Sequence, residues 1–196
     1  MALKILGVSG SLRNGSFSRR ALELTLDAVP NPEAETRLLD LGRSELPMYR
    51  PGARAPAEVV RQVAGAVTWA DAFLLATPDY HGSMSGAMKN FLDYHWEEFA
   101  GKLFGYICAS HEKGLTAMDQ MRTAVRQCYG WSLPYGVSVH GEHDFDEAGA
   151  VINARLAGRF RMLARDLTVY GTLLRGQFQH DLVEGSHDTF ASRYHS

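Results

Sequence analysis

The amino-acid sequence predicts a doubly wound α/β domain, a five-stranded parallel sheet in the order 2-1-3-4-5 with helices on both faces. Strand-like and helix-like segments alternate along the chain. Residues 72–76 form a short continuous apolar run, which is typical of a parallel strand buried on both faces. Five strand–helix units with right-handed connections give a sheet between two helical layers.

The elements follow from apolar spacing and from the positions of Pro and Gly. We predict strands over residues 3–8, 36–41, 72–76, 103–109 and 133–139. We predict helices over residues 18–29, 59–67, 86–98, 118–129 and 152–170, and a Pro- and Gly-rich loop over 42–56. The last helix has the clearest period, with apolar residues three or four positions apart at Ile152, Leu156, Phe160, Leu163, Leu167 and Tyr170.

Composition places the chain among ordinary globular proteins. Of its 196 residues, 45% are hydrophobic and 21% are charged, and the formal net charge is −2. This charge favours neither nucleic acid nor an anionic membrane as a partner. We predict one domain over residues 1–175, and a polar tail, or an arm on a neighbouring subunit, over residues 176–196.

The cysteines and the N-terminal residues indicate a cytoplasmic location. Cys108 and Cys128 show no metal-ligand spacing and are expected to be core thiols, which fits a reducing compartment. The first strand begins within three residues of Met1 and leaves no room for a signal peptide. No segment approaches the roughly 18 consecutive apolar residues of a membrane span, and no metal site is predicted.

The loop after the first strand is rich in glycine and hydroxyl groups and predicts an anion site. Gly10 and Gly15 have the spacing of a triphosphate loop, but Ser16 and Phe17 stand where Lys and Ser/Thr are required. The glycine spacing does not match a dinucleotide fingerprint either. A set of hydroxyls with one arginine remains, and it suits a single terminal phosphate such as that of FMN. This set is Ser9, Ser11, Ser16, Ser18 and Arg13.

The fold predicts a second half for this site. In a sheet of order 2-1-3-4-5, ligands bind at the carboxyl ends of strands 1 and 3, where the strand order reverses. The loop after the third strand, residues 77–85, reads Thr-Pro-Asp-Tyr-His-Gly-Ser-Met-Ser. Pro78 stiffens the start of this loop, and Gly82 lets the backbone approach a planar ligand.

These two loops together resemble the NADPH-dependent FMN reductase family. The first reads Gly-Ser-Leu-Arg at residues 10–13, and the second is similar to the family pattern T-P-E-Y-N-G-S-x-x-G-x-L-K-N-x-x-D. Asp79 stands where the family more often has Glu, and His81 where it has Asn. The resemblance extends from residue 3 to about 175. It implies a flavodoxin-like fold, bound FMN, and hydride transfer from NADPH, or less often NADH, to a small acceptor.

The resemblance also implies a role for each loop. The first loop would bind the FMN phosphate through Ser11, Arg13, Ser16 and Ser18. The second would run beside the ribityl chain and the flavin ring, with backbone N–H groups steadying negative charge on the reduced ring. Its residues are Pro78, Asp79, Tyr80, His81, Gly82, Ser83 and Met84. A third flavin loop would begin at Ser110 and include Gly114, with His111, Glu112 and Lys113 in place of a glycine pair.

Several alternatives stay open on the sequence. Ser11, Ser16 and Ser18 could be turn and cap residues, Ser18 as a helix N-cap, and Arg13 could pair with a surface carboxylate or contact the NADPH 2′-phosphate. Tyr80 could be ordinary loop packing, and His81 could be a proton donor to the acceptor. His111 and Glu112 could influence the choice of acceptor.

The kind of activity and the assembly also have alternatives. Candidate acceptors are quinones, azo and nitro compounds, metal oxyanions and free flavin, and the rival functions are a flavodoxin-type electron carrier and a redox-sensing flavoprotein module. The predicted helix 86–98 and the residues beside it carry Phe91, Leu92, Tyr94, Trp96 and Phe99, more large apolar side chains than one core face requires. This favours a homodimer or homotetramer formed through that helix.

Overall fold

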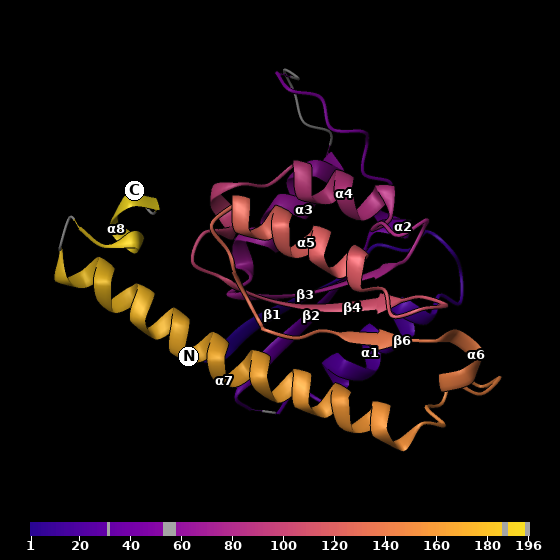
Figure 1. The fold of residues 1–196 in the computed structure, drawn as a ribbon. Coiled ribbons are helices and arrows are strands. Elements are labelled where there is room, and N and C mark those ends of the chain that lie inside the picture. Colours follow the sequence, from indigo (N-terminus) through magenta and orange to yellow (C-terminus); the bar gives the residue numbers. More distant parts are fainter. Residues whose placement is uncertain (31, 53–57, 186–187, 195–196) are drawn as a thin grey trace.

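The computed structural model describes residues 1–30, 32–52, 58–185 and 188–194, and in these a parallel sheet lies between two layers of helices (Figure 1). Its strands are β1 (Leu3–Ser9), β2 (Ala34–Asp40), β3 (Ala72–Pro78), β4 (Leu103–Ala109), β5 (Trp131–Ser132) and β6 (Val137–Val139). The order is β2-β1-β3-β4-β5, with β6 also paired to β4, and all these pairings are parallel. The predicted fold class and strand order are confirmed.

Each face of the sheet has its own hydrophobic core. Helices α1 (Phe17–Asp27) and α7 (Ala154–Glu184) cover one face, and α3 (Glu58–Trp69), α4 (Gly86–Asp93) and α5 (Leu115–Gln127) cover the other (Figure 1). Leu22, Phe160 and Leu163 pack under the first pair, and Phe91 and Met121 belong to the core on the opposite face. Because apolar layers cover both faces, the polar loops gather at the strand ends.

The fifth predicted strand is wrong as a continuous element. Residues 133–139 contain only β6, and β5 lies before them, so two short strands flank an irregular segment over 133–136. Pro134 has no backbone N–H and therefore cannot continue the ladder of hydrogen bonds. The segment bends at Pro134, and Gly136 sits so close to Met118 that an added Cβ would lie 2.5 Å from its sulfur.

The predicted helix 86–98 is also too long. Helix α4 ends at Asp93, and a 3-10 turn, η1 (Glu97–Phe99), follows it. The turn carries Phe99 back into the core, where its ring packs edge-on against Phe73 and Phe104 at centroid distances of 5.2 and 5.1 Å. Most of the expected surplus of apolar side chains is therefore buried within the chain, and Trp96 is 59% exposed.

The last helix is longer than predicted. Asn153 caps the N-terminus of α7, and the helix continues nine residues beyond 175 to Glu184. The four central positions of its predicted apolar face are buried, but Ile152 precedes the helix and Tyr170 is 46% exposed. A final short helix, α8 (Phe190–Tyr194), packs on Phe178 through its aromatic residues. Residues 186–187 and 195–196 of the predicted tail lie outside the described residues.

The remaining elements agree with prediction to within a few residues. The loop predicted over 42–56 overlaps a short helix, α2 (Leu41–Ser44), and its residues 53–56 lie outside the described part. Cys108 is fully buried, which raises the pKa of its thiol to about 12, and Cys128 is partly buried. Among the described residues, no helix combines the length and apolar character needed to cross a membrane.

Candidate flavin site

Four loops at the carboxyl edge of the sheet line a cavity of about 400 Å³, a volume in the range of small-molecule sites. The cavity lies at the β1/β3 switch point, as predicted. Its lining residues are Ser11, Arg13, Gly15, Ser16, Phe17, Pro78, Asp79, Tyr80, Ala109, Ser110, His111, His140, Gly141, Glu142 and His143.

The loop after β1 provides buried hydroxyl groups and one exposed arginine. Ser11 and Ser16 are 4% and 7% exposed. Ser16, and not Ser18 as one alternative held, is the N-cap of α1. Ser18 is fully buried and its hydroxyl lies 2.9 Å from that of Ser16, so it supports Ser16 from behind rather than lining the cavity. The Arg19 N–H donates to the Ser16 hydroxyl, and the preceding N–H groups of the first helical turn begin beside these hydroxyls, an arrangement that suits an anion.

The hydroxyl of Ser9 lies apart from this set. Ser9 is fully buried at the end of β1, and among the described residues its Oγ has no hydrogen-bond partner. It does not line the cavity. Of the four serines expected at the phosphate, Ser11 and Ser16 line the cavity and Ser18 supports Ser16. Ser9 is buried at the end of β1 and does not reach the cavity.

Asp79 holds the loop after β3 in shape. Its Oδ1 accepts the backbone N–H of Gly82 at 2.8 Å, and its Oδ2 accepts the hydroxyl of Ser110 at 3.0 Å. One carboxylate therefore joins the loops that follow β3 and β4. Tyr80 is 51% exposed beside the cavity, and His81 adopts a left-handed φ of 58°, a conformation that histidine tolerates better than most residues.

The backbone donors of this loop are largely used inside it. The N–H of Tyr80 donates to the Ser83 carbonyl at 2.9 Å, and the N–H of Ser83 donates back at 3.1 Å. With Gly82 already bound to Asp79, only the N–H groups of His81 and Met84 in residues 79–84 have no hydrogen-bond partner among the described residues, and neither residue lines the cavity. The expectation that the whole loop would offer N–H groups to a flavin ring is therefore not met by most of its residues.

Three predicted residues contact neighbouring elements rather than the cavity. Ser83 donates its hydroxyl to Gln120 Oε1 at 2.6 Å, and with Met84 it lines a separate groove between α4 and α5. Gly114 begins α5 with a φ of 58°, and a Cβ there would lie 2.6 Å from the Cys108 sulfur. Gly114 is therefore required by packing.

Sequence reasoning missed a fourth wall, the loop after β6. It includes helix α6 (Gly141–Asp144) and contributes His140, Glu142 and His143 to the cavity. Its backbone is close to the first loop, because a Cβ on Gly141 would lie 3.2 Å from the Phe17 ring. The switch-point rule predicted only the loops after strands 1 and 3, and the family resemblance implied the loop after strand 4. The polar run after Val139 would have indicated the fourth.

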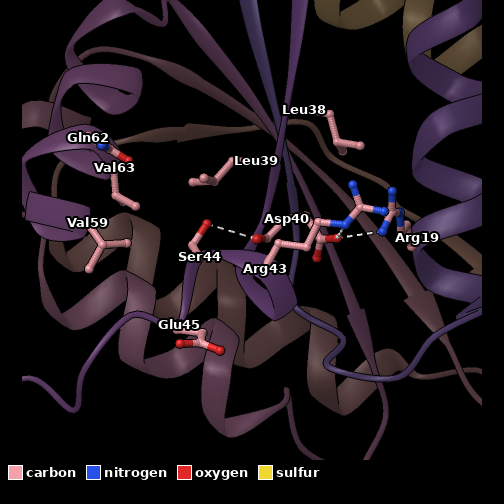
Figure 2. A pocket seen from close by; sticks show the side chains of 10 residues that line it. All are labelled: Arg19, Leu38, Leu39, Asp40, Arg43, Ser44, Glu45, Val59, Gln62 and Val63. Atoms are coloured by element: carbon pink, nitrogen blue, oxygen red, sulfur yellow. Dashed lines mark hydrogen bonds and ion pairs between the residues drawn. The ribbon is translucent and has the colours of Figure 1, made fainter.

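A larger neighbouring cavity, of about 650 Å³, lies between α1, β2 and α3. Figure 2 shows Arg19 turned toward Asp40, and Asp40 forms ion pairs with both Arg19 and Arg43. Arg19 is in addition bound to Glu23 at 2.9 Å, and these carboxylates hold its pKa above the ordinary value. The cationic groups are thus neutralised within the chain. We therefore place the candidate site in the smaller cavity, where buried hydroxyls and helix N–H groups face open space.

A doubly wound parallel sheet in the order β2-β1-β3-β4-β5, with a hydroxyl-rich loop at its switch point, is the architecture of flavodoxin-like mononucleotide-binding proteins. Residues 3–144 match the NADPH-dependent FMN reductase family. The chain belongs to this family and is an oxidoreductase that uses FMN and NAD(P)H.

Individual relatives agree with this assignment. The chain is 36% identical over 188 residues to an NAD(P)H-dependent FMN reductase of Pseudomonas aeruginosa, covering 89% of this chain and 98% of the relative. It is 30% identical over 145 residues to an NADPH azoreductase of Bacillus sp. (strain OY1-2), covering 72% and 79%. The fold is similar to that of the flavoenzyme FerB of Paracoccus denitrificans, with a TM-score of 0.74, 21% identity and coverage of 88% and 98%.

Proposed function

We propose that the chain binds FMN in the 400 Å³ cavity and reduces a small acceptor with electrons from NADPH, or less often NADH. The observation that carries this proposal is the meeting of Ser11, Ser16 and Arg13 with Pro78, Asp79 and Tyr80 around one cavity. Family membership favours this enzymatic role over the electron carrier and the redox-sensing module.

The donor set fits a flavin mononucleotide. Hydroxyls that are more than nine-tenths buried, together with first-turn N–H groups, suit a phosphate that needs several hydrogen bonds at once. Ser11 and Ser16 would hold the phosphate, Ser18 would orient Ser16, and Arg13 would cover the outer side. When bound, FMN supplies the hydride chemistry, accepting a hydride from NAD(P)H and passing electrons to the acceptor.

The protein would position the flavin rather than provide a catalytic acid or base. Pro78 and Asp79 would shape the wall beside the ribityl chain, and Tyr80 and His81 would lie beside the ring. The N–H group of His81, which has no partner among the described residues and follows Tyr80 at the cavity, would be available to the pole of the ring that becomes negative on reduction. Ser83 and Gly114 would act indirectly, through Gln120 and the start of α5.

The names of the relatives suggest the acceptor class. Quinone and azo reductases occur among them, and both classes of acceptor are planar and conjugated. We propose an acceptor of this kind, which would stack on the exposed face of the flavin near Tyr80. We also propose a cytoplasmic location, since buried free thiols such as Cys108 fit a reducing compartment.

Steady-state kinetics test this function. The purified protein loaded with FMN should oxidise NADPH in the presence of a benzoquinone or an azo dye, with ping-pong kinetics. Ser16→Ala should weaken FMN binding at least tenfold, because it removes a buried phosphate donor and the partner of Ser18. Ser44→Ala, in the neighbouring cavity, is the control and should leave binding unchanged. Failure of the wild type to oxidise NADPH with any acceptor would overturn the proposal.

A homo-oligomer remains part of the proposal. Trp96 is 59% exposed next to the end of α4, and a groove between α4 and α5 that includes Met84 lies on the same helical layer. Both features lie on the side of the molecule that the predicted helix 86–98 occupies. Sedimentation of the wild type and of Trp96→Ser tests this. A dimer or tetramer that the substitution weakens is expected, and a monomeric wild type would contradict the proposal.

A further inference from the structure

Three histidines gather at the mouth of the candidate flavin cavity. The ring centroids of His140 and His143 lie 4.3 Å apart, and those of His111 and His140 lie 5.6 Å apart in a T-shaped arrangement. They come from two loops, the one after β4 and the one after β6, and all three line the cavity. Among the described residues, no group of His, Cys, Asp or Glu has an arrangement that could hold a metal ion.

Hydrogen bonds and ring packing fix the conformation of the loop that carries His140 and His143. The buried carboxylate of Asp144 accepts the backbone N–H of His140 at 2.7 Å and the side-chain amide of Asn153 at 2.8 Å. Asn153 in turn caps α7, and Phe145 stacks on Phe17 of α1 at 5.7 Å. The two histidines therefore stand on a segment tied to both helices of one face of the sheet.

The charge of the cavity depends on these histidines. When they are neutral, the charged lining residues are one arginine, Arg13, and two carboxylates, Asp79 and Glu142. Protonation of the three imidazoles reverses the balance from negative to positive. The carboxylate of Asp79 is already hydrogen-bonded to Gly82 and Ser110, so it is poorly placed to neutralise them.

The other charged groups around the cluster are also accounted for. Glu112 and Lys113 follow His111 on the exposed part of its loop, where their opposite charges offset one another. The Asp144 carboxylate points to the backbone of its own loop and to Asn153, and Tyr80 completes the opposite wall. Glu142, on α6, remains as the carboxylate beside the cluster, and one carboxylate does not balance three imidazolium groups.

We propose that His111, His140 and His143 bind an anionic group of the second substrate and make the enzyme prefer anionic over neutral substrates at mildly acidic pH. The phosphate of FMN has its own donors in the loop after β1, on a different wall of the cavity. The histidines are thus left for a molecule that enters from the mouth, with a sulfonate, a carboxylate or a phosphate. Identification of that molecule as acceptor or hydride donor rests on the proposed function; anion binding does not.

Direct binding tests the cluster without turnover. Anthraquinone-2-sulfonate, whose charge does not change with pH, and the uncharged anthraquinone-2-methanol are titrated calorimetrically at pH 6.0 and 8.0. The sulfonate should bind about tenfold more tightly at pH 6.0, because proton uptake by the imidazoles would make the charge of the lining positive. The alcohol should bind equally at both pH values. The double variant His140→Gln/His143→Gln should lose the pH dependence, whereas His180→Gln, an exposed histidine of α7, should keep it.

Kinetics then separate the two sources of the anion. In a ping-pong reaction, kcat/KM of the donor and of the acceptor report separate half-reactions. If the acceptor carries the anion, the double variant loses about tenfold in the ratio of kcat/KM for a sulfonated over an unsulfonated naphthoquinone at pH 6.0. If the hydride donor carries the anion, the double variant instead loses in the ratio of kcat/KM for NADPH over kcat/KM for NADH. Either result supports the proposal.

Two results would overturn the inference, and both differ from a failure of the proposed function. One is equal binding of the sulfonate at pH 6.0 and 8.0 by the wild type. The other is a pH dependence that the double variant retains. A wild type that binds the sulfonate in the predicted way but does not oxidise NADPH would leave the anion site standing and contradict only the reductase.

Discussion

At the scale of single residues, Asp79 organises the candidate site. It is predicted as a flavin contact, and in the structure its side chain joins two loops. Its two carboxylate oxygens accept hydrogen bonds from Gly82 and Ser110, on successive loops of the sheet edge. Hydrogen bonds to a charged group each contribute roughly 1.5–3 kcal/mol, so the geometry of the loops after β3 and β4 depends on this one side chain.

Asp79→Ala should therefore weaken FMN binding by about tenfold to a hundredfold. The substitution removes the hydrogen bonds to Gly82 and Ser110, and the two loops would have to be ordered when FMN binds. Quenching of flavin fluorescence on titration of the apoprotein measures the effect. Asp93→Ala, which removes an exposed ion pair with Lys89 on α4, is the matched control and should not alter the affinity. An unchanged FMN affinity in Asp79→Ala would show that the loops hold their shape without the carboxylate.

A second residue-scale prediction concerns His95, which lies at the end of α4. It is 5% exposed, neither ring nitrogen has a hydrogen-bond partner among the described residues, and burial lowers its pKa to about 4. Between pH 6.5 and about 4, the unfolded chain, whose histidine pKa is near 6.5, binds a proton at this residue, whereas the folded chain does not. Stability is therefore fully present above pH 6.5 and is lost as the pH falls from 6.5 toward 4.

The expected loss attributable to His95 is about 2 kcal/mol between pH 7.5 and pH 5. Urea unfolding at the two pH values measures it. His95→Phe, whose ring can keep the contacts with Phe91 and Phe99, should reduce the difference by this amount, whereas His180→Gln should not. If wild type and His95→Phe lose the same stability on acidification, the low pKa is contradicted.

At the scale of elements, two glycines associated with helices, Gly114 and Gly176, are expected to have opposite effects on stability when a side chain is added. Gly114 begins α5 with a left-handed φ of 58° and lies against Cys108. Gly176 lies in the exposed part of α7, and a Cβ there would meet nothing within 4 Å. A side chain at the first position is strained and crowded, whereas at the second it restricts the unfolded chain and favours the helix.

Gly114→Ala should destabilise the protein by about 2 kcal/mol or more, through the positive φ and the close contact with sulfur. Gly176→Ala should stabilise it by roughly 0.5–1 kcal/mol. Urea denaturation measures both free energies of unfolding, and their dependence on urea concentration should be unchanged. Each variant serves as the control of the other. Equal effects of the two substitutions would contradict the described geometry of these helices.

The same scale shows where sequence-based prediction succeeds and fails. The long strands and amphipathic helices were predictable because continuous apolar runs and a 3.6-residue period reflect burial directly. The break in the fifth strand was not recognised, although Pro134 indicates it. The end of α4 at Asp93 depends on where the Phe99 ring finds room beside Phe73 and Phe104, which local periodicity does not reveal.

At the scale of the whole molecule, the candidate site joins residues that are far apart in the sequence. The loops after β1 and β3 were predicted to meet because ligands bind at the switch point of such a sheet, and the family resemblance added the loop after β4. The fourth wall, with His140 and His143, follows because parallel strands end at a common edge, and it was missed. What each side chain does at the edge was less predictable: Ser18 turned out to be support, and Ser83 to face Gln120. These roles depend on rotamers and on packing between elements.

The central claim is that this cavity binds FMN and uses it to oxidise NAD(P)H. The most direct measurement is an anaerobic absorption spectrum of the FMN-loaded protein, freed of excess flavin, before and after addition of NADPH. We predict a bound flavin whose visible absorption bleaches promptly, and a Ser16→Ala variant that retains less flavin. A protein that retains no FMN, or a bound flavin that stays oxidised with both NADPH and NADH, would contradict the account.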